Sequence, residues 1–209
     1  MKQLKVKICG MREPENIQEV AKLRPDYMGF IFYPDSPRYV GARFQLQYDL
    51  GPVKPVGVFV NEKPQAIADL CSHQAIQTVQ LHGHESTSDC DHLKQKGFQV
   101  IKAFAIDRDF DFSKVYPFQS VVDYFLFDTK GSSFGGNGFP FPWIKLNEYQ
   151  VDIPFFLSGG LSVNNLPDAL NLNHPQLEGL DFNSGLEISP GRKSKSLAKL
   201  AIETTQSKK

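Results

Sequence analysis

One pattern repeats along this chain: a short apolar run, a polar or glycine-bearing loop, and then usually a segment with helical periodicity. Eight such runs, rich in β-branched, aromatic and aliphatic residues, are typical of buried strands. They are Val6–Cys9, Tyr27–Phe32, Val56–Val60, Ile76–Leu81, Val100–Phe104, Tyr124–Phe127, Pro154–Leu157 and Leu177–Phe182. Strands that alternate with helices pair in parallel through right-handed crossovers, so eight units favour a closed (β/α)8 TIM barrel over an open doubly wound sheet.

Between the apolar runs, apolar residues spaced i, i+3, i+4 predict surface helices with one buried stripe each. The predicted stripes are Ile17, Val20 and Ala21; Ile67, Leu70 and Cys71; Leu166, Ala169 and Leu170; and Leu197, Leu200 and Ala201. Pro14 and Pro64 suit first helical turns, and Ser86, Ser88 and Ser162 suit helix caps. The segments Gly41–Leu50 and Phe110–Gln119 have poor periodicity and predict a helix only weakly.

The chain has 209 residues, enough for one sizeable core. Barrels of this type usually have roughly 250 residues, so short loops and no inserted domain are expected. The Pro/Gly-rich stretches each lie at a strand end, which leaves no linker. We therefore expect a single barrel domain over residues 1–209.

Charge and cysteine content limit the partners and the compartment. Lys+Arg 23 balance Asp+Glu 23, so no global field draws the chain onto nucleic acid or an anionic membrane, and an anionic ligand must be held locally. The chain has three cysteines, Cys9, Cys71 and Cys90, and an odd number cannot form a fully paired disulfide framework. They also lack the paired C-x-x-C clusters of a structural zinc site. With no apolar run near the roughly 18 residues of a spanning helix, we predict a soluble cytoplasmic protein with neither a nucleic-acid nor a membrane partner.

Catalytic groups in such barrels lie just beyond the C-terminal ends of the strands. Cys9 ends the first run beside Gly10, as either a buried small hydrophobe or a thiolate base or nucleophile. Taken alone, the residue type favours the buried hydrophobe, because free cysteines are mostly buried and inert. Arg38 follows the second run in a loop with two prolines, where it either holds a carboxylate or phosphate bidentately or is a surface arginine in a turn.

Two further strand ends present titratable side chains. His82 and His84 follow the fourth run, but without an acidic or third imidazole partner nearby they favour a polar site or loop role, and no metal is predicted. Asp128 follows the sixth run as a candidate general acid, or as the cap of a turn. The glycine-rich stretch Gly131–Gly138 after it has the composition of a loop that moves over a substrate.

Glycine-bearing loops follow the seventh and eighth runs, at Ser158-Gly159-Gly160-Leu161 and Asn183-Ser184-Gly185-Leu186-Glu187. In eight-stranded barrels these two loops, with a short helix N-terminus, form the recurrent phosphate site. One glycine pair is weak evidence, but pairs at both expected places predict a phosphorylated ligand.

The candidate residues belong to short motifs that follow one another in a fixed order along the chain. They are Lys7-Ile8-Cys9-Gly10, Gly29-Phe30-Ile31-Phe32 leading to Ser36-Pro37-Arg38-Tyr39-Val40, Val56-Gly57-Val58-Phe59-Val60-Asn61, Gln80-Leu81-His82-Gly83, Phe127-Asp128-Thr129, Gly135-Gly136-Asn137-Gly138, Ser158-Gly159-Gly160-Leu161 and Asp181-Phe182-Asn183-Ser184-Gly185-Leu186-Glu187. Together they cover nearly the whole length. In this order and spacing the chain resembles the phosphoribosylanthranilate isomerase family of tryptophan biosynthesis.

The resemblance implies the (β/α)8 barrel and an Amadori rearrangement of N-(5-phosphoribosyl)anthranilate into an open-chain 1-deoxyribulose phosphate, with no metal and no cofactor. Asp128 would be the general acid that protonates the ribose ring oxygen, and Cys9 the general base that takes the C2′ proton to give an enolamine. This reverses the reading of Cys9 as inert. Arg38 would bind the anthranilate carboxylate. The amides around Gly159, Gly160, Ser184 and Gly185 would hold the phosphate, and His82 lies near the pocket without an assigned step.

The sequence departs from the family pattern at several places. The family more often has threonine at Asn137, alanine at Ser158 and serine at Asn183, and the aspartate usual after Lys193 is missing. These changes bear on loop geometry and affinity. We expect mainly main-chain phosphate contacts, which tolerate them.

The sequence also has two alternative functions and two possible oligomeric states. The histidine-pathway isomerase performs the same rearrangement on an aminoimidazole carboxamide nucleotide, but it uses two aspartates, one at the place of Cys9, and its substrate needs a second anion site. A non-catalytic phosphate-binding barrel is the alternative of another class. The residues fit a monomer and a homodimer equally well.

Overall fold

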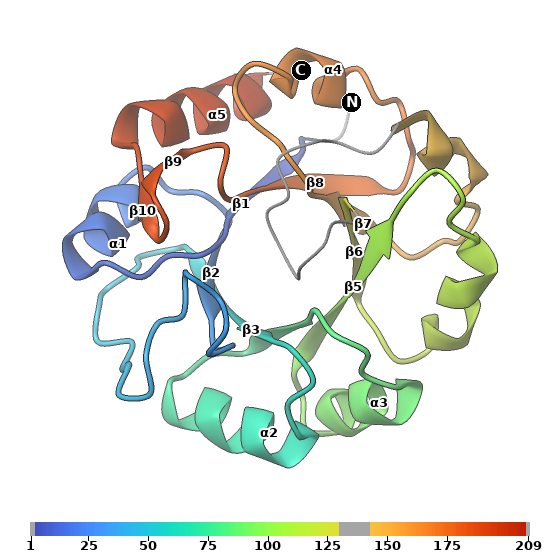
Figure 1. The fold of residues 1–209 in the computed structure, drawn as a ribbon, viewed down its shortest axis with the longest axis horizontal. Coiled ribbons are helices and arrows are strands. Elements are labelled where there is room, and N and C mark those ends of the chain that lie inside the picture. The colour runs from blue at the N-terminus through green and yellow to red at the C-terminus, as the bar shows by residue number, and fades with distance from the viewer. Residues whose placement is uncertain (1–2, 130–142, 208–209) are drawn as a thin grey trace.

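The computed structural model describes residues 3–129 and 143–207, in which eight parallel strands close into a barrel in chain order (Figure 1). The strands are β1 (Lys5–Ile8), β2 (Tyr27–Ile31), β3 (Lys54–Phe59), β4 (Thr78–Leu81), β5 (Gln99–Ile106), β6 (Tyr124–Thr129), β7 (Phe155–Leu157) and β8 (Leu177–Phe182). The predicted (β/α)8 fold is confirmed. The strand bounds shift by one or two residues at several ends, and one shift concerns the site: β6 continues through Asp128 to Thr129, so Asp128 lies inside the strand and not after it.

Helices form the outer ring of the barrel (Figure 1). They are α1 (Pro14–Ala21), α2 (Pro64–His73), α3 (Thr87–Gln95), α4 (Leu166–Leu170) and α5 (Lys195–Ser207), with 3-10 helices η1 (Phe112–Phe118) and η2 (Trp143–Glu148). Within the described ranges, no helix combines the length and apolarity needed to cross a membrane.

The predicted helix starts are correct in part. Pro14 and Pro64 are the first residues of α1 and α2, and Ser86 caps α3 through reciprocal hydrogen bonds with Asp89. Ser88 lies inside α3, and the residue before α4 is Asn165, so the caps predicted at Ser88 and Ser162 were wrong. Both serines stand near a helix start, where residue type alone does not fix the boundary.

An irregular segment stands where a helix was only weakly predicted after β2. Of residues 41–50, none is helical. The side chain of Gln74, the residue directly after α2, accepts from the Leu46 N–H and donates to the Phe44 carbonyl oxygen. Phe44 in turn lies against the rings of Phe30 and Phe32. Side-chain packing and amide pairing thus replace the missing helix as the cover of β2.

The stripe predicted for α5 is displaced by one residue. Leu200 is 49% exposed, whereas Ala198, Ala201 and Ile202 are buried. An i, i+3, i+4 stripe fits both registers, and the observed one places two alanines on the buried face. The small side chains allow α5 to contact β1, α1 and α4.

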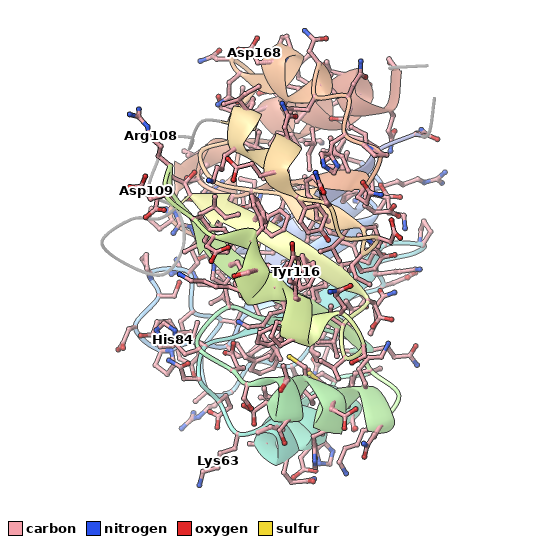
Figure 2. The ribbon with its side chains drawn as sticks, turned by 90° about the vertical axis from the view of Figure 1, so that its right-hand side faces the viewer. Lys63, His84, Arg108, Asp109, Tyr116 and Asp168 are labelled. Carbon is pink, nitrogen blue, oxygen red and sulfur yellow. The ribbon has the colours of Figure 1, made fainter. Side chains whose placement is uncertain are left out.

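Alternation along β1 separates two environments. Val6 and Ile8 belong to the main core between strands and helices, whereas Cys9 belongs to a separate cluster inside the barrel. The other buried members of that interior cluster are Tyr27, Val56, Val58, Ile101, Ala103, Leu126 and Phe156. Figure 2 shows that Lys63, His84, Arg108 and Asp109, from the loops after β3, β4 and β5, lie toward one end of the barrel.

A buried ion pair fixes the loop after β4. Lys102 on β5 donates to Glu85 over 2.9 Å, and Glu85 also accepts from the Asn61 and Gly83 N–H groups. The two side chains are 3% and 2% exposed. We expect Lys102→Met to lower the free energy of unfolding by about 3–5 kcal/mol, because it leaves a buried carboxylate without its cation. Urea unfolding measures this loss.

The control is Lys94→Met, which breaks the shorter but part-exposed Lys94–Asp123 pair of 2.7 Å. We expect a loss of about 0–1 kcal/mol there, because water screens that pair. Equal losses for the two variants would contradict the argument from burial.

Candidate active site

A pocket lies where the C-terminal ends of the strands meet. Its walls are Cys9, Ile31, Tyr33, Ser36, Arg38, Val58, Val60, Gln80, His82, Asp128, Ser158, Gly159, Gly160, Leu161, Asp181, Asn183 and Ser184. Every site residue predicted from the sequence is among them except Gly185. The barrel thus brings together the ends of strands that are far apart in the chain.

Gly185 lies just outside the pocket wall and joins the two glycine-bearing loops. It forms an isolated parallel bridge with Ser162, and a β-carbon at position 185 would overlap the carbonyl oxygen of Leu161. Only glycine permits this close approach. Gly185 therefore holds the loop after β8 against the loop after β7.

The loop after β7 turns sharply through Gly159 and Gly160, whose φ angles are +87° and +70°. A β-carbon at Gly159 would also collide with Thr129 at the end of β6. The Asn165 side chain closes the turn, because Nδ2 donates to the Gly160 carbonyl oxygen and Oδ1 accepts from the Ser162 N–H. Asn165 is not among the residues predicted from the sequence.

Asp128 is held from two sides at the end of β6. Its Oδ1 accepts from the Thr129 N–H over 2.8 Å, and its Oδ2 lies 3.3 Å from His82 Nε2. His82 Nδ1 contacts the Gln80 amide nitrogen at 2.7 Å. When that amide donates to Nδ1, a neutral imidazole carries its proton on Nε2 and presents it to Asp128. The contact orients the Asp128 carboxyl group.

Cys9 lies among buried charges inside the barrel. Burial raises the pKa of its thiol above the ordinary value, and the negative charge of Asp181 acts in the same direction. The ammonium groups of Lys7 and Lys193 oppose that rise, Lys7 also by a hydrogen bond. The site therefore keeps the thiolate costly but supplies two cations that can support it once it forms.

Arg38 is anchored by a carboxylate. Its Nε and Nη2 donate to the two oxygens of Glu187 over 2.8 and 2.7 Å, in a bidentate pair. Lys193 donates to the same Glu187 over 2.7 Å and to Asn183 Oδ1 over 2.7 Å. A two-stranded hairpin of β9 (Glu187–Ser189) and β10 (Arg192–Lys193) brings Glu187 and Lys193 together behind Arg38, which is itself a wall of the pocket.

Glu187 and Lys193 of this cluster are both charged near neutral pH. Burial alone would raise the pKa of Glu187, but hydrogen bonds from Arg38 and Lys193 outweigh it and bring the pKa down to about 2. Burial lowers the pKa of Lys193 to about 8, against the attraction of Glu187. Arg38, Lys193 and Glu187 together carry one net positive charge, and Arg38 presents it at the pocket wall, which favours an anionic group beside Arg38.

Several functional candidates escaped the sequence analysis, namely Lys7, Gln80, Asp181, Glu187 and Lys193. A signal existed for three of them, because Lys7, Gln80 and Asp181 interrupt otherwise apolar strands. A charged residue within a buried run needs a partner, and that requirement points to the barrel interior. The glycine-rich stretch with Asn137 lies outside the described residues. Within them, no group of three or more His, Cys, Asp or Glu is placed to hold a metal ion.

Comparison with known proteins identifies relatives of this chain. The family model described as N-(5′phosphoribosyl)anthranilate (PRA) isomerase matches residues 6–204. The N-(5′-phosphoribosyl)anthranilate isomerase of Parabacteroides distasonis is 44% identical over 193 residues, covering 90% of this chain and 87% of that protein.

Two solved structures are similar over almost the full length. The phosphoribosyl anthranilate isomerase of Thermotoga maritima has a TM-score of 0.83 at 31% identity, covering 97% of this chain and 98% of that one. A second, in complex with reduced 1-(o-carboxyphenylamino)-1-deoxyribulose 5-phosphate, has a TM-score of 0.80 at 30% identity with the same coverage.

Proposed function

The chain belongs to the N-(5′-phosphoribosyl)anthranilate isomerase family. We propose that it catalyses the isomerisation of N-(5′-phosphoribosyl)anthranilate in tryptophan biosynthesis, with Asp128 as general acid and Cys9 as general base. The observation that carries the proposal is that both groups line one pocket together with Arg38. A ring opening followed by removal of the C2′ proton needs one donor and one acceptor within reach of a single bound sugar.

In the first step, Asp128 gives its proton to the ribose ring oxygen. The C1′–O bond breaks as the nitrogen lone pair forms the C1′=N bond, which opens the ring to a protonated Schiff base. Oδ2 is the atom that His82 holds at 3.3 Å, so His82 acts as a positioning residue for the acid.

In the second step, the Cys9 thiolate takes the C2′ proton. The electron pair of the C–H bond forms a C1′=C2′ bond, and the C1′=N pair returns to nitrogen, which gives the enolamine. Lys7 and Lys193 both attract the thiolate. Their charges lower the cost of forming the base inside the barrel.

Arg38 and the glycine-bearing loops hold the two ends of the substrate. A guanidinium has five N–H donors, and Glu187 uses two of those of Arg38, so the others are available for the anthranilate carboxylate. Gly159, Gly160 and Ser184 supply main-chain amides for the phosphate at the opposite loops, with Gly185 keeping those loops together.

The activity is tested by adding the protein to N-(5′-phosphoribosyl)anthranilate made in situ and following the decay of anthranilate-type fluorescence. We expect decay in proportion to enzyme, without added metal. Absence of enzyme-dependent decay would contradict the proposed function. The aminoimidazole carboxamide nucleotide serves as the comparison substrate, which we expect to react far more slowly because Cys9 stands where that enzyme has an aspartate.

Glu187→Gln should raise KM by about 10–100-fold with a smaller effect on kcat, because a charge-assisted hydrogen bond of about 1.5–3 kcal/mol no longer orients Arg38. Initial rates over a range of substrate concentrations measure both constants. Glu13→Gln is the control, since Glu13 pairs with Arg12 at the surface and is not a wall of the pocket. A loss confined to kcat would show that Glu187 acts on the chemistry and not on binding.

The substrate is a small phosphoribosyl molecule, and we further propose a cytoplasmic monomer or homodimer. All three cysteines are unpaired and buried, which fits a reducing compartment. The Thermotoga maritima relative is described as a dimeric protein from which monomers were generated. Sedimentation of this chain at micromolar concentration distinguishes the two states.

A further inference from the structure

A buried ion pair lies beside Cys9 inside the barrel. Lys7 and Asp181 are register partners on β1 and β8, and Lys7 Nζ donates to Asp181 Oδ2 over 3.0 Å. The two side chains are 0% and 4% exposed. Asp181 is a wall of the pocket together with Cys9 and Asp128, so the three side chains face one ligand space.

One oxygen of Asp181 is left over. Lys7 occupies Oδ2, while Oδ1 is buried and has no hydrogen-bond partner within residues 3–129 and 143–207. An unpaired buried carboxylate oxygen is costly and rare in folded proteins. At the wall of a pocket, the cost is relieved when a bound ligand donates a hydrogen bond to that atom.

The rearrangement contains a step that lacks an assigned group. Once Cys9 has taken the C2′ proton, the enolamine carries a hydroxyl group on C2′. To become the ketone, that hydroxyl must lose its proton while C1′ gains one. Asp128 has acted at the ring oxygen, and Cys9 holds the proton destined for C1′, so the hydroxyl proton needs a third acceptor.

We propose that Asp181 is this third catalytic group, with Oδ1 accepting the proton of the 2′-hydroxyl. The proposal rests on the roles proposed above for Cys9 and Asp128. The O–H electron pair becomes the second bond of C2′=O, and the C1′=C2′ pair takes the proton from Cys9. Asp181 then holds one proton more than at the start and Asp128 one fewer, and transfer through solvent water restores both.

The surroundings of Asp181 suit a proton acceptor. Burial raises the pKa of its carboxyl group, against the attraction of Lys7, and the negative charge of Asp128 raises it further. A carboxylate more basic than usual accepts a proton more readily. Lys7 interacts with both Asp181 and Cys9, so it acts as a positioning residue that keeps the two acceptors together.

The experiment is single turnover of Asp181→Asn with ordinary substrate and with substrate deuterated at C2′, followed by absorbance of the anthranilate ring. The ring is conjugated differently in the enolamine than in the ketone, so the two stages give separate phases. We expect a first phase that is sensitive to deuterium and no slower than in the wild type, because loss of the Asp181 charge favours the Cys9 thiolate. The second phase, formation of the ketone, should slow by about 10²–10⁴-fold.

Two results would overturn the proposal. One is an unchanged overall rate. The other is a loss of rate confined to the deuterium-sensitive phase, which would show that Asp181 acts only by supporting proton removal by Cys9. Binding of the reduced product analogue verifies that the pocket is intact. If Asp181→Asn does not fold, Asp181→Ser gives the same test. The matched control is Glu178→Gln, which neutralises the buried acid that pairs with Lys5 on the same two strands, and it should leave both phases unchanged.

The test also separates this inference from the proposed base. Cys9→Ser should lose the deuterium-sensitive phase altogether. If that phase survives in Cys9→Ser, the role of Cys9 fails, and the two-phase behaviour of Asp181→Asn then decides the role of Asp181 independently.

Discussion

Asp128→Asn should lower kcat by about 10³–10⁴-fold while leaving affinity for the reduced product analogue unchanged. The amide has the same shape, and its oxygen still accepts from the Thr129 N–H, but its NH2 group accepts no hydrogen bond from His82 Nε2 and gives no proton to the ring oxygen. Without that proton the leaving oxygen departs as an alkoxide, which is far less stable. Steady-state fluorescence decay and titration with the analogue measure the two quantities.

The matched control is Asp168→Asn, an exposed aspartate on α4 that is not a wall of the pocket and lies at the top of the view in Figure 2. It should keep full activity. Retention of more than a tenth of the wild-type kcat in Asp128→Asn would remove Asp128 as the acid and leave His82, which touches it, as the next candidate.

The barrel could be predicted because each strand is a local, nearly continuous apolar run. Burial on both faces of a parallel strand makes such runs visible in one sequence. Helices were harder, because their stripes tolerate more than one register, as α5 shows with Leu200 exposed and Ala198 buried. The cover of β2 was beyond prediction, since it depends on Gln74 meeting a segment about thirty residues away.

Some residues of the candidate site could be predicted from the sequence and others could not. Residues that follow strand ends, such as Arg38 and His82, could be predicted because the fold assigns a function to that place. Lys7 and Asp181 are 174 positions apart and meet only when β8 closes on β1. Their pairing depends on the closure of the barrel, so it cannot be predicted from either residue alone. Glu187 is similar, because its partner Arg38 comes from the loop after β2.

Cys9 should give the pH–rate profile of kcat a rising limb on the alkaline side. Burial raises the pKa of the thiol above its ordinary value of 9.0, so the thiolate fraction grows as the pH rises through neutrality toward that value. The charged groups that face the thiol are Lys7, Asp181 and Lys193. Lys193, with a pKa of about 8, loses its charge in the same interval and weakens substrate binding, so kcat at saturation is the quantity to follow.

Cys9→Asp should remove this limb, because a carboxylate is already ionised at neutral pH, and Cys9→Ser should lower kcat by about 10²–10⁴-fold across the whole range. Cys90→Ser is the control: burial raises the pKa of that thiol to about 12, and the residue is on the buried face of α3 and is not a wall of the pocket. A rising limb that persists in Cys9→Asp would belong to another group. The base of this reaction would then have to be sought among the other acceptors of the pocket, with Asp181 the first of them, since it lines the same pocket as Cys9 and its Oδ1 has no hydrogen-bond partner in the described part of the chain.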